Sequence, residues 1–157
     1  MKHKDRTETP SQIAKRVIDS RCKCYAGHLH SRYSRSKGFA VNFDRLERFP
    51  GRMQKASAWS DLQGKSRIDE PWLNGLARLI FVSDMGDALA GEVDNDYLKA
   101  EVIDNVLSKK GSRHIWLWLT KRPSQMALFS NWLEESGLTW PDNLVAMTSV
   151  TSRRTVG

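Results

Sequence analysis

Charged and hydroxyl side chains follow three apolar segments of the sequence, at the points where buried strands would end. These polar segments are 83–87 (Ser-Asp-Met-Gly-Asp), 120–123 (Thr-Lys-Arg-Pro) and 148–151 (Thr-Ser-Val-Thr). In parallel α/β folds, functional residues collect where a strand has ended and the next helix has not yet begun. The sequence therefore predicts a ligand site at the carboxyl ends of these strands.

Two acidic and two basic residues are the candidate ligand-binding side chains of this site. Lys121 and Arg122 stand just before a predicted helix and suit a phosphate or a carboxylate. Asp84 or Asp87 suits an amine, a ribose hydroxyl or a metal ion. A purely structural interpretation stays open, in which Asp87 merely begins the next loop and Arg122 pairs with Asp84 to tie the sheet together.

A second group of candidate ligands lies near the N-terminus and consists of Cys22, Cys24, His28 and His30. Zinc accepts these ligand types, but common zinc sites separate two ligand pairs by a longer loop, and on one helix the four side chains would not converge. Two thiols this close in sequence do not make a disulfide framework, so a reducing compartment is expected. The alternative is that both thiols pack on a helix as small side chains.

Three buried strands are predicted ahead of the polar segments, over residues 76–83, 114–120 and 144–150. The intervening helical patterns predict right-handed βαβ units, so the three strands should be adjacent and parallel. Trp116 and Trp118 must share one face of their strand, with the residue between them on the other face. Because both faces carry large apolar groups, we expect both faces to be covered.

The two helices that connect these strands have recognisable ends. The first begins at Asp94 or Asn95, either of which can cap it, and runs to about Lys110. The second follows Pro123 and is stopped by Gly137. In the first helix, the residues predicted to face inward are Leu98, Val102, Ile103, Val106 and Leu107. The apolar residues of the second helix are Met126, Leu128, Phe129, Trp132 and Leu133.

The N-terminal half of the chain is basic. Residues 1–67 hold 16 Lys and Arg against 6 Asp and Glu, a net charge of +10, whereas residues 68–157 hold 9 against 12, a net charge of −3. A basic half of this kind could meet nucleic acid or another anion. The alternative is a solvated and partly flexible segment, because charge runs are usually exposed to solvent.

The domain interpretation is a flexible tail at residues 1–9 followed by one α/β domain over 10–157. Within this domain the basic segment 10–67 is irregular, with one short strand predicted at 39–43, and the regular βα units occupy 76–157. No helix follows the last predicted strand, which is unusual for a complete α/β domain. We therefore interpret the chain as a truncated or partial copy of a larger barrel.

Composition excludes several classes of protein. The chain has 157 residues, of which 39% are hydrophobic and 27% charged, as in globular proteins. No apolar run approaches the roughly 20 residues of a transmembrane helix, and the N-terminus lacks the apolar region of a secretory signal. These features predict a cytoplasmic protein without a membrane partner.

Several segments together resemble the phage gene thirty-seven/sixty-eight protein family, an uncharacterised family placed among radical S-adenosylmethionine-like barrels. That family has a strand end "I-F-V-x-S-M-x-D-L-F", a helix opening "D-V-P-D", a strand end "L-T-K-R-P-x-x-M" and a strand "P-N-V-W-x-G-V-S-V". The similar segments here are 79–87, 92–97, 119–126 and 141–150, preceded by Cys24-Tyr25-Ala26, Gly38-Phe39 and Asp44-Arg45-Leu46 in the family's order. The resemblance covers roughly residues 22–151.

The resemblance implies an iron-sulfur cluster and S-adenosylmethionine as cofactors, but the cysteines depart from the family's pattern. The family carries three cysteines as C-x6-C-x2-C-Y, and only Cys24 is in register here. Arg21 and Ala14 occupy the other two positions, and Cys22 is one residue away. A four-iron cluster with one open iron needs three thiolates, so two cysteines cannot hold it unless His28 or His30 adds an uncommon ligand.

The sequence thus predicts a partial parallel (β/α) barrel of the radical S-adenosylmethionine type with an irregular basic N-terminal segment. By resemblance it is either an iron-sulfur enzyme, with Cys22 and Cys24 as metal ligands, or a degenerate copy of one. Asp84, Asp87, Lys121 and Arg122 would hold the cofactor or substrate. The alternative is a non-catalytic accessory protein of a phage or mobile element that uses its basic half on nucleic acid.

Overall fold

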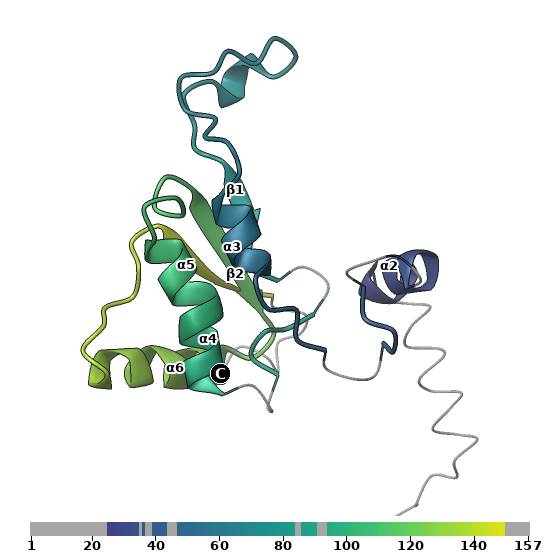
Figure 1. The fold of residues 1–157 in the computed structure, drawn as a ribbon, viewed down its shortest axis with the longest axis vertical. Coiled ribbons are helices and arrows are strands. Elements are labelled where there is room, and N and C mark those ends of the chain that lie inside the picture. The colour runs from purple at the N-terminus through teal and green to yellow at the C-terminus, as the bar shows by residue number, and fades with distance from the viewer. Residues whose placement is uncertain are drawn as a thin grey trace, which may run out of the picture. The chain divides into compact units, whose positions relative to one another are not determined.

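The computed structural model describes residues 25–34, 36, 39–43, 47–83, 86–90 and 94–149. The chain divides into two compact units, Met1–Glu47 and Arg48–Gly157. The boundary between them lies inside the segment 10–67 that the sequence marks as basic and irregular. The second unit carries the predicted βα units (Figure 1).

The helical segments follow one another along the chain as short pieces. They are α2 (Tyr25–Tyr33), α3 (Arg52–Ser57), the 3-10 turn η1 (Pro71–Leu73), α4 (Asn95–Leu98), the π-helical turn η2 (Lys99–Ile103), α5 (Asp104–Leu107) and α6 (Pro123–Glu135).

In the first unit, the strand predicted at residues 39–43 is not formed, so that prediction was wrong. The segment instead packs by its aromatic rings against α2. The ring centroids of Tyr33 and Phe39 are 5.6 Å apart, and those of His30 and Phe43 are 5.4 Å apart. Aromatic residues at alternate positions can pack on a helix from a loop as well as from a strand. Their spacing alone therefore does not distinguish a loop from a strand.

The second unit is a mixed α/β fold around a small parallel sheet. Its strands are β1 (Leu79–Phe81), β2 (Ile115–Thr120) and β3 (Leu144–Thr148), in the order β1-β2-β3. Both pairings are parallel, which confirms the predicted arrangement, although β1 and β3 are shorter than predicted. The described residues form a three-stranded sheet and not a closed barrel. The predicted α/β class is therefore confirmed, whereas the predicted barrel is not shown.

The helix between β1 and β2 begins where the sequence indicates. The Asp94 carboxylate accepts a hydrogen bond from the Tyr97 backbone N–H at 2.6 Å and thereby caps α4. The helix continues through η2 and ends with α5, earlier than predicted. Leu107 was expected to face inward but is 48% exposed. The wide π turn alters the helical phase after Leu98, so a constant 3.6-residue period misplaces the end of this helix.

Helix α6 starts at Pro123 and ends at Glu135, just before the Gly137 that was predicted to stop it. Gly137 has φ 78°, a left-handed conformation that favours glycine. Its N–H donates to the Glu134 carbonyl, and the Leu138 N–H donates to the Leu133 carbonyl, both at 2.9 Å, which is the hydrogen-bond pattern of a Schellman motif. Of the apolar residues of this helix, Met126, Phe129 and Leu133 are buried, whereas the Leu128 side chain is 60% exposed.

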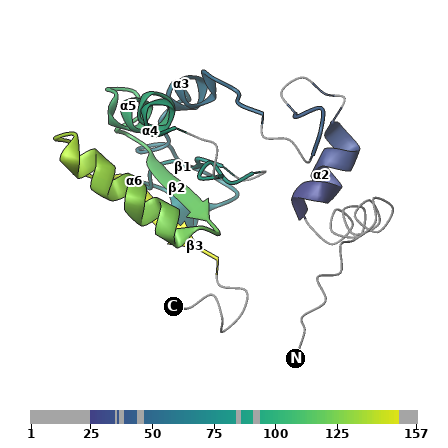
Figure 2. The ribbon, with the colours of Figure 1, turned by 90° about the horizontal axis from the view of Figure 1, so that it is seen from below.

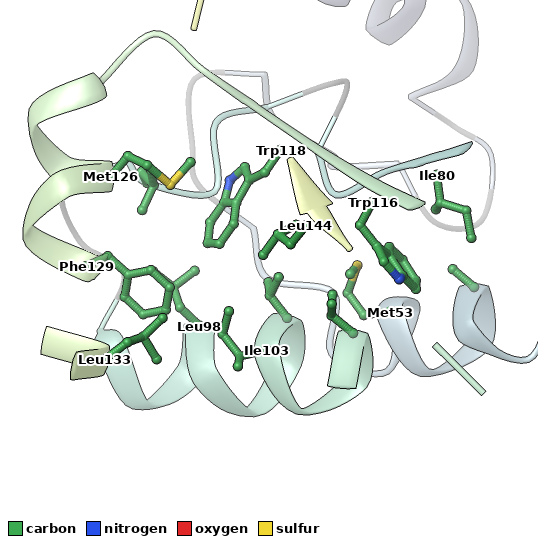
Figure 3. Close-up of a cluster of buried hydrophobic side chains, with 14 residues drawn as sticks. Met53, Ile80, Leu98, Ile103, Trp116, Trp118, Met126, Phe129, Leu133 and Leu144 are labelled. Atoms are coloured by element: carbon green, nitrogen blue, oxygen red, sulfur yellow. The ribbon is translucent and has the colours of Figure 1, made fainter. Parts of the chain in front are cut away.

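The core lies between one face of the sheet and the helices (Figure 3). Trp116 and Trp118 share this face and are both fully buried, which confirms the prediction for them. Figure 2 shows α4, α5 and α6 along one side of the sheet. The buried apolar residues are Met53, Ala56, Ile80, Leu89, Leu98, Val102, Ile103, Val106, Trp116, Trp118, Met126, Phe129, Leu133 and Leu144.

The opposite face of the sheet is apolar and open among the described residues. Side chains on this face include Leu79, Phe81, Ile115, Leu119 and Val145, with exposed fractions between 37% and 61%. The prediction that both faces are covered was therefore wrong for the described part of the chain. The reason is that the buried residues of all the helices between the strands join the core on a single face.

Candidate functional site

The Asp87 carboxylate is the centre of a polar cluster at the carboxyl end of the sheet. One of its oxygens accepts from the Leu89 backbone N–H at 3.1 Å, and the other accepts from the Lys121 backbone N–H at 3.1 Å. The Thr120 hydroxyl donates to the carboxylate, with its oxygen 2.9 and 3.0 Å from the two carboxylate oxygens. Arg122 Nη1 forms an ion pair with it at 3.0 Å.

Thr120 links this carboxylate to the turn between β2 and α6. It is the last residue of β2 and is 2% exposed. Its hydroxyl oxygen also accepts from the Arg122 backbone N–H at 2.9 Å. A strand end and a loop that lie 33 residues apart in sequence are therefore joined through one threonine and one aspartate.

The structure places three of the four predicted residues together. Arg122 was expected within reach of Asp84 or Asp87, and the contact with Asp87 confirms this geometry. Lys121 joins the cluster through its backbone, whereas its side chain is exposed and its ammonium has no partner among the described residues. Asp84 lies outside the described residues. The same contacts suit a structural ion pair and a ligand site, which differ in whether loss of the Lys121 charge weakens ligand binding.

Two buried serine hydroxyls were missed by the reasoning from sequence. Ser83 follows β1 and Ser149 follows β3, and each has a buried Oγ without a hydrogen-bond partner in the described part of the chain. With Thr120, every strand of the sheet is therefore followed or ended by a hydroxyl side chain. Buried hydroxyls usually find a partner. The signal was present in the polar segments 83–87 and 148–151, but serine is too common at strand ends to stand out.

The candidate metal ligands near the N-terminus are not brought together by anything described. Cys22 and Cys24 lie outside the described residues. His28 is exposed, and His30 places its Nε2 2.9 Å from the Ala40 carbonyl oxygen, a structural contact. Among the residues that the structure covers, no three His, Cys, Asp or Glu side chains cluster as metal ligands would.

The described helices are also too short or too polar to span a lipid bilayer.

Comparison with known proteins places the chain in one family. The model of a family described as "Protein of unknown function (DUF5131)" matches residues 1–156. Searches of curated proteins and of solved structures found no match. The family's description names neither a phage protein nor a radical S-adenosylmethionine enzyme, so those finer predictions stay proposals. Because the match extends over nearly the whole sequence, the chain belongs to the DUF5131 family.

Proposed function

We propose that this protein is a degenerate radical S-adenosylmethionine-like barrel protein of the phage type, which binds S-adenosylmethionine or a related anionic ligand at the carboxyl end of its sheet. The observation that carries the proposal is the cluster at that end. It holds Arg122 on Asp87 and leaves the Lys121 ammonium without a partner among the described residues. Ligands of parallel α/β folds bind at this end of the strands.

The open face of the sheet supports the barrel part of this proposal. In a (β/α) barrel the helices cover the outer face of every strand, and branched apolar side chains from the inner face fill the interior. Here the helices between the strands pack on one face, while Leu79, Ile115, Leu119 and Val145 stand on the other. Further strands that closed a barrel would bury these side chains.

Within the cluster, the residues have different proposed roles. Lys121 supplies a mobile positive charge that would meet the carboxylate of the ligand. Arg122 is already neutralised by Asp87, so it contributes to the ligand mainly by its remaining N–H donors. Asp87 is a positioning residue, because its oxygens are all engaged by the protein itself. Asp84 is proposed to bind the ligand's amine, because a carboxylate suits an ammonium group.

The binding role of Lys121 can be measured directly. Lys121→Ala is expected to weaken binding of S-adenosylmethionine about tenfold in isothermal titration calorimetry, because one charge-assisted contact is lost. The melting temperature should not change, since the ammonium has no partner in the described structure. Lys110→Ala is the matched control, because Lys110 is also exposed but lies after α5, outside the cluster. Equal weakening in both variants, or no binding to the unmodified protein, would contradict the proposal.

The iron-sulfur cofactor implied by the resemblance does not fit this chain. The sequence has two cysteines, and a four-iron cluster with an open iron needs three thiolates. Of the two described histidines near these cysteines, His30 already uses Nε2 in a contact with a backbone carbonyl, and His28 is exposed to solvent. For this reason no reductive step is assigned to the protein.

We expect anaerobic reconstitution with iron and sulfide to leave no stable four-iron cluster on the chain. Iron counting and Mössbauer spectroscopy after gel filtration measure this outcome. About four irons per chain in one stable cluster would restore the enzyme interpretation and overturn the degenerate one.

The charge distribution favours one second function, binding of nucleic acid by the basic half of the chain. Residues 1–67 carry a net charge of +10 and the remainder −3. Phosphate contacts release counterions, so such binding weakens steeply as salt rises. A duplex or single strand that binds at 50 mM salt and dissociates at 200 mM would support this function, and binding that ignores salt would refute it.

A further inference from the structure

A small pocket of about 190 Å³ lies beside the cluster, between the loop that follows Asp87 and the first turns of α4 and α6. Its floor is apolar and consists of Leu89, Leu98 and Phe129, which are 5%, 2% and 1% exposed. It is smaller than the roughly 300–1,000 Å³ of pockets that hold drug-sized ligands. The pocket therefore has room for one ring system and not for a complete nucleotide.

The rim of the pocket adds hydrogen-bonding groups to this apolar floor. Asn95 from α4 and Gln125 from α6 both line it, and neither side-chain amide has a hydrogen-bond partner among the described residues. Each amide offers two donors and an acceptor. Leu128 also lines the pocket, which accounts for an apolar side chain of α6 that is 60% exposed to solvent.

We propose that this pocket binds a flat heteroaromatic ring that carries a hydrogen-bond donor and an acceptor on its edge, the class to which the nucleobases belong. The apolar floor would cover the ring, and an amide pairs with an edge that presents a donor next to an acceptor, as asparagine and glutamine do with adenine. No charged side chain from the described part of the chain lines the pocket, so a neutral ring suits it best.

The pocket is held in shape by contacts already described. The Leu89 backbone N–H donates to the Asp87 carboxylate, which also accepts a hydrogen bond from the Thr120 hydroxyl at the end of β2. Asn95 follows the capping residue of α4, and the Gln125 N–H donates to the Arg122 carbonyl at 3.1 Å. Walls fixed before a ligand arrives reduce the entropy lost on binding. Asp87 is thus a positioning residue for the pocket as well as for Arg122.

The inference does not rest on the proposed function, since a neutral ring needs neither Lys121 nor Arg122. Adenine is a suitable probe, and benzene is its counterpart without edge groups. In ¹H–¹⁵N NMR spectra of the full chain, adenine should give saturable shifts of the backbone signals of Leu89, Asn95 and Gln125. Benzene should bind more weakly, because it cannot pair with the amides.

A variant pair separates edge recognition from simple burial. Gln125→Leu should weaken adenine binding about fivefold, the loss expected for one hydrogen bond. Gln54→Leu, which replaces another exposed glutamine on α3, should leave adenine binding unchanged. Lys121→Ala should also leave it unchanged, which keeps this test apart from that of the anion site. The inference is overturned if adenine produces no saturable shifts at these residues. It is overturned equally if benzene binds as well as adenine, or if Gln125→Leu binds adenine like the unmodified protein.

Discussion

Replacing Trp118 with alanine is expected to lower the free energy of unfolding by about 3–5 kcal/mol, the range for large aromatic residues removed from a core. The side chain is fully buried and joins β2 to two other parts of the second unit. Its ring meets Phe129 edge-on with centroids 5.6 Å apart and stacks on Trp140 at 6.0 Å. Alanine would leave a cavity between the sheet and α6 that neighbouring side chains could fill only in part.

Chemical denaturation followed by circular dichroism measures this loss. Trp72→Ala is the matched control, because Trp72 is 71% exposed in η1, and substitutions at such positions usually change stability by less than about 0.5 kcal/mol. If Trp118→Ala unfolded at the same denaturant concentration as the Trp72 variant, the core between β2 and α6 would be misassigned.

The two tryptophans of β2 differ in their polar atoms, which refines the expectation. Trp116 Nε1 donates to the Gly111 carbonyl at 3.0 Å, whereas Trp118 Nε1 is buried without a partner among the described residues. Phenylalanine at position 116 therefore loses a hydrogen bond worth about 1 kcal/mol, and phenylalanine at position 118 removes an unsatisfied donor. The first variant should be the less stable of the two.

The parts of the fold that could be predicted from sequence depend on strong local periodicity. The alternation around Trp116 and Trp118 correctly placed both rings on one face of β2, and the Asp94 cap and Gly137 marked two helix ends. The errors arose where tertiary context decides. Leu128 fits the apolar pattern of α6 and yet stands at the rim of a pocket, because exposure there depends on what packs beside it.

The site was predictable only in outline, for a similar reason. The rule that strand ends gather at one edge correctly brought the loop after β1 to the Lys121–Arg122 turn, but spacing could not tell which aspartate would meet Arg122. The pocket beside it escaped notice because its lining comes from three segments that no motif connects. Its amides, Asn95 and Gln125, are ordinary helix residues until the fold places them together.

The Asp87 carboxylate offers the second large effect. Asp87→Ala is expected to destabilise the protein by about 2–4 kcal/mol, because a buried hydroxyl and two backbone N–H groups lose their acceptor, and each unsatisfied buried group costs roughly 1–3 kcal/mol. The hydroxyl is that of Thr120, and the N–H groups are those of Leu89 and Lys121. The ion pair itself should add little, since the Arg122 side chain is 46% exposed and stays hydrated without a partner.

Three variants together distinguish the hydrogen bonds from the charge in thermal and chemical denaturation. Asp87→Asn keeps one acceptor oxygen and the shape of the side chain, but its amide NH2 replaces the second acceptor and faces a hydrogen-bond donor. The stability of this variant should therefore fall between those of the unmodified protein and Asp87→Ala. Asp69→Ala removes an exposed carboxylate from the segment between α3 and β1 and should change stability very little. If Asp87→Ala had the same melting temperature as Asp69→Ala, the Asp87 carboxylate would not be what holds the loop to β2. If the carboxylate does hold the loop, as expected, its removal takes away the support of the Leu89 wall of the ring pocket, and Asp87→Ala should bind adenine more weakly although Gln125 is unchanged.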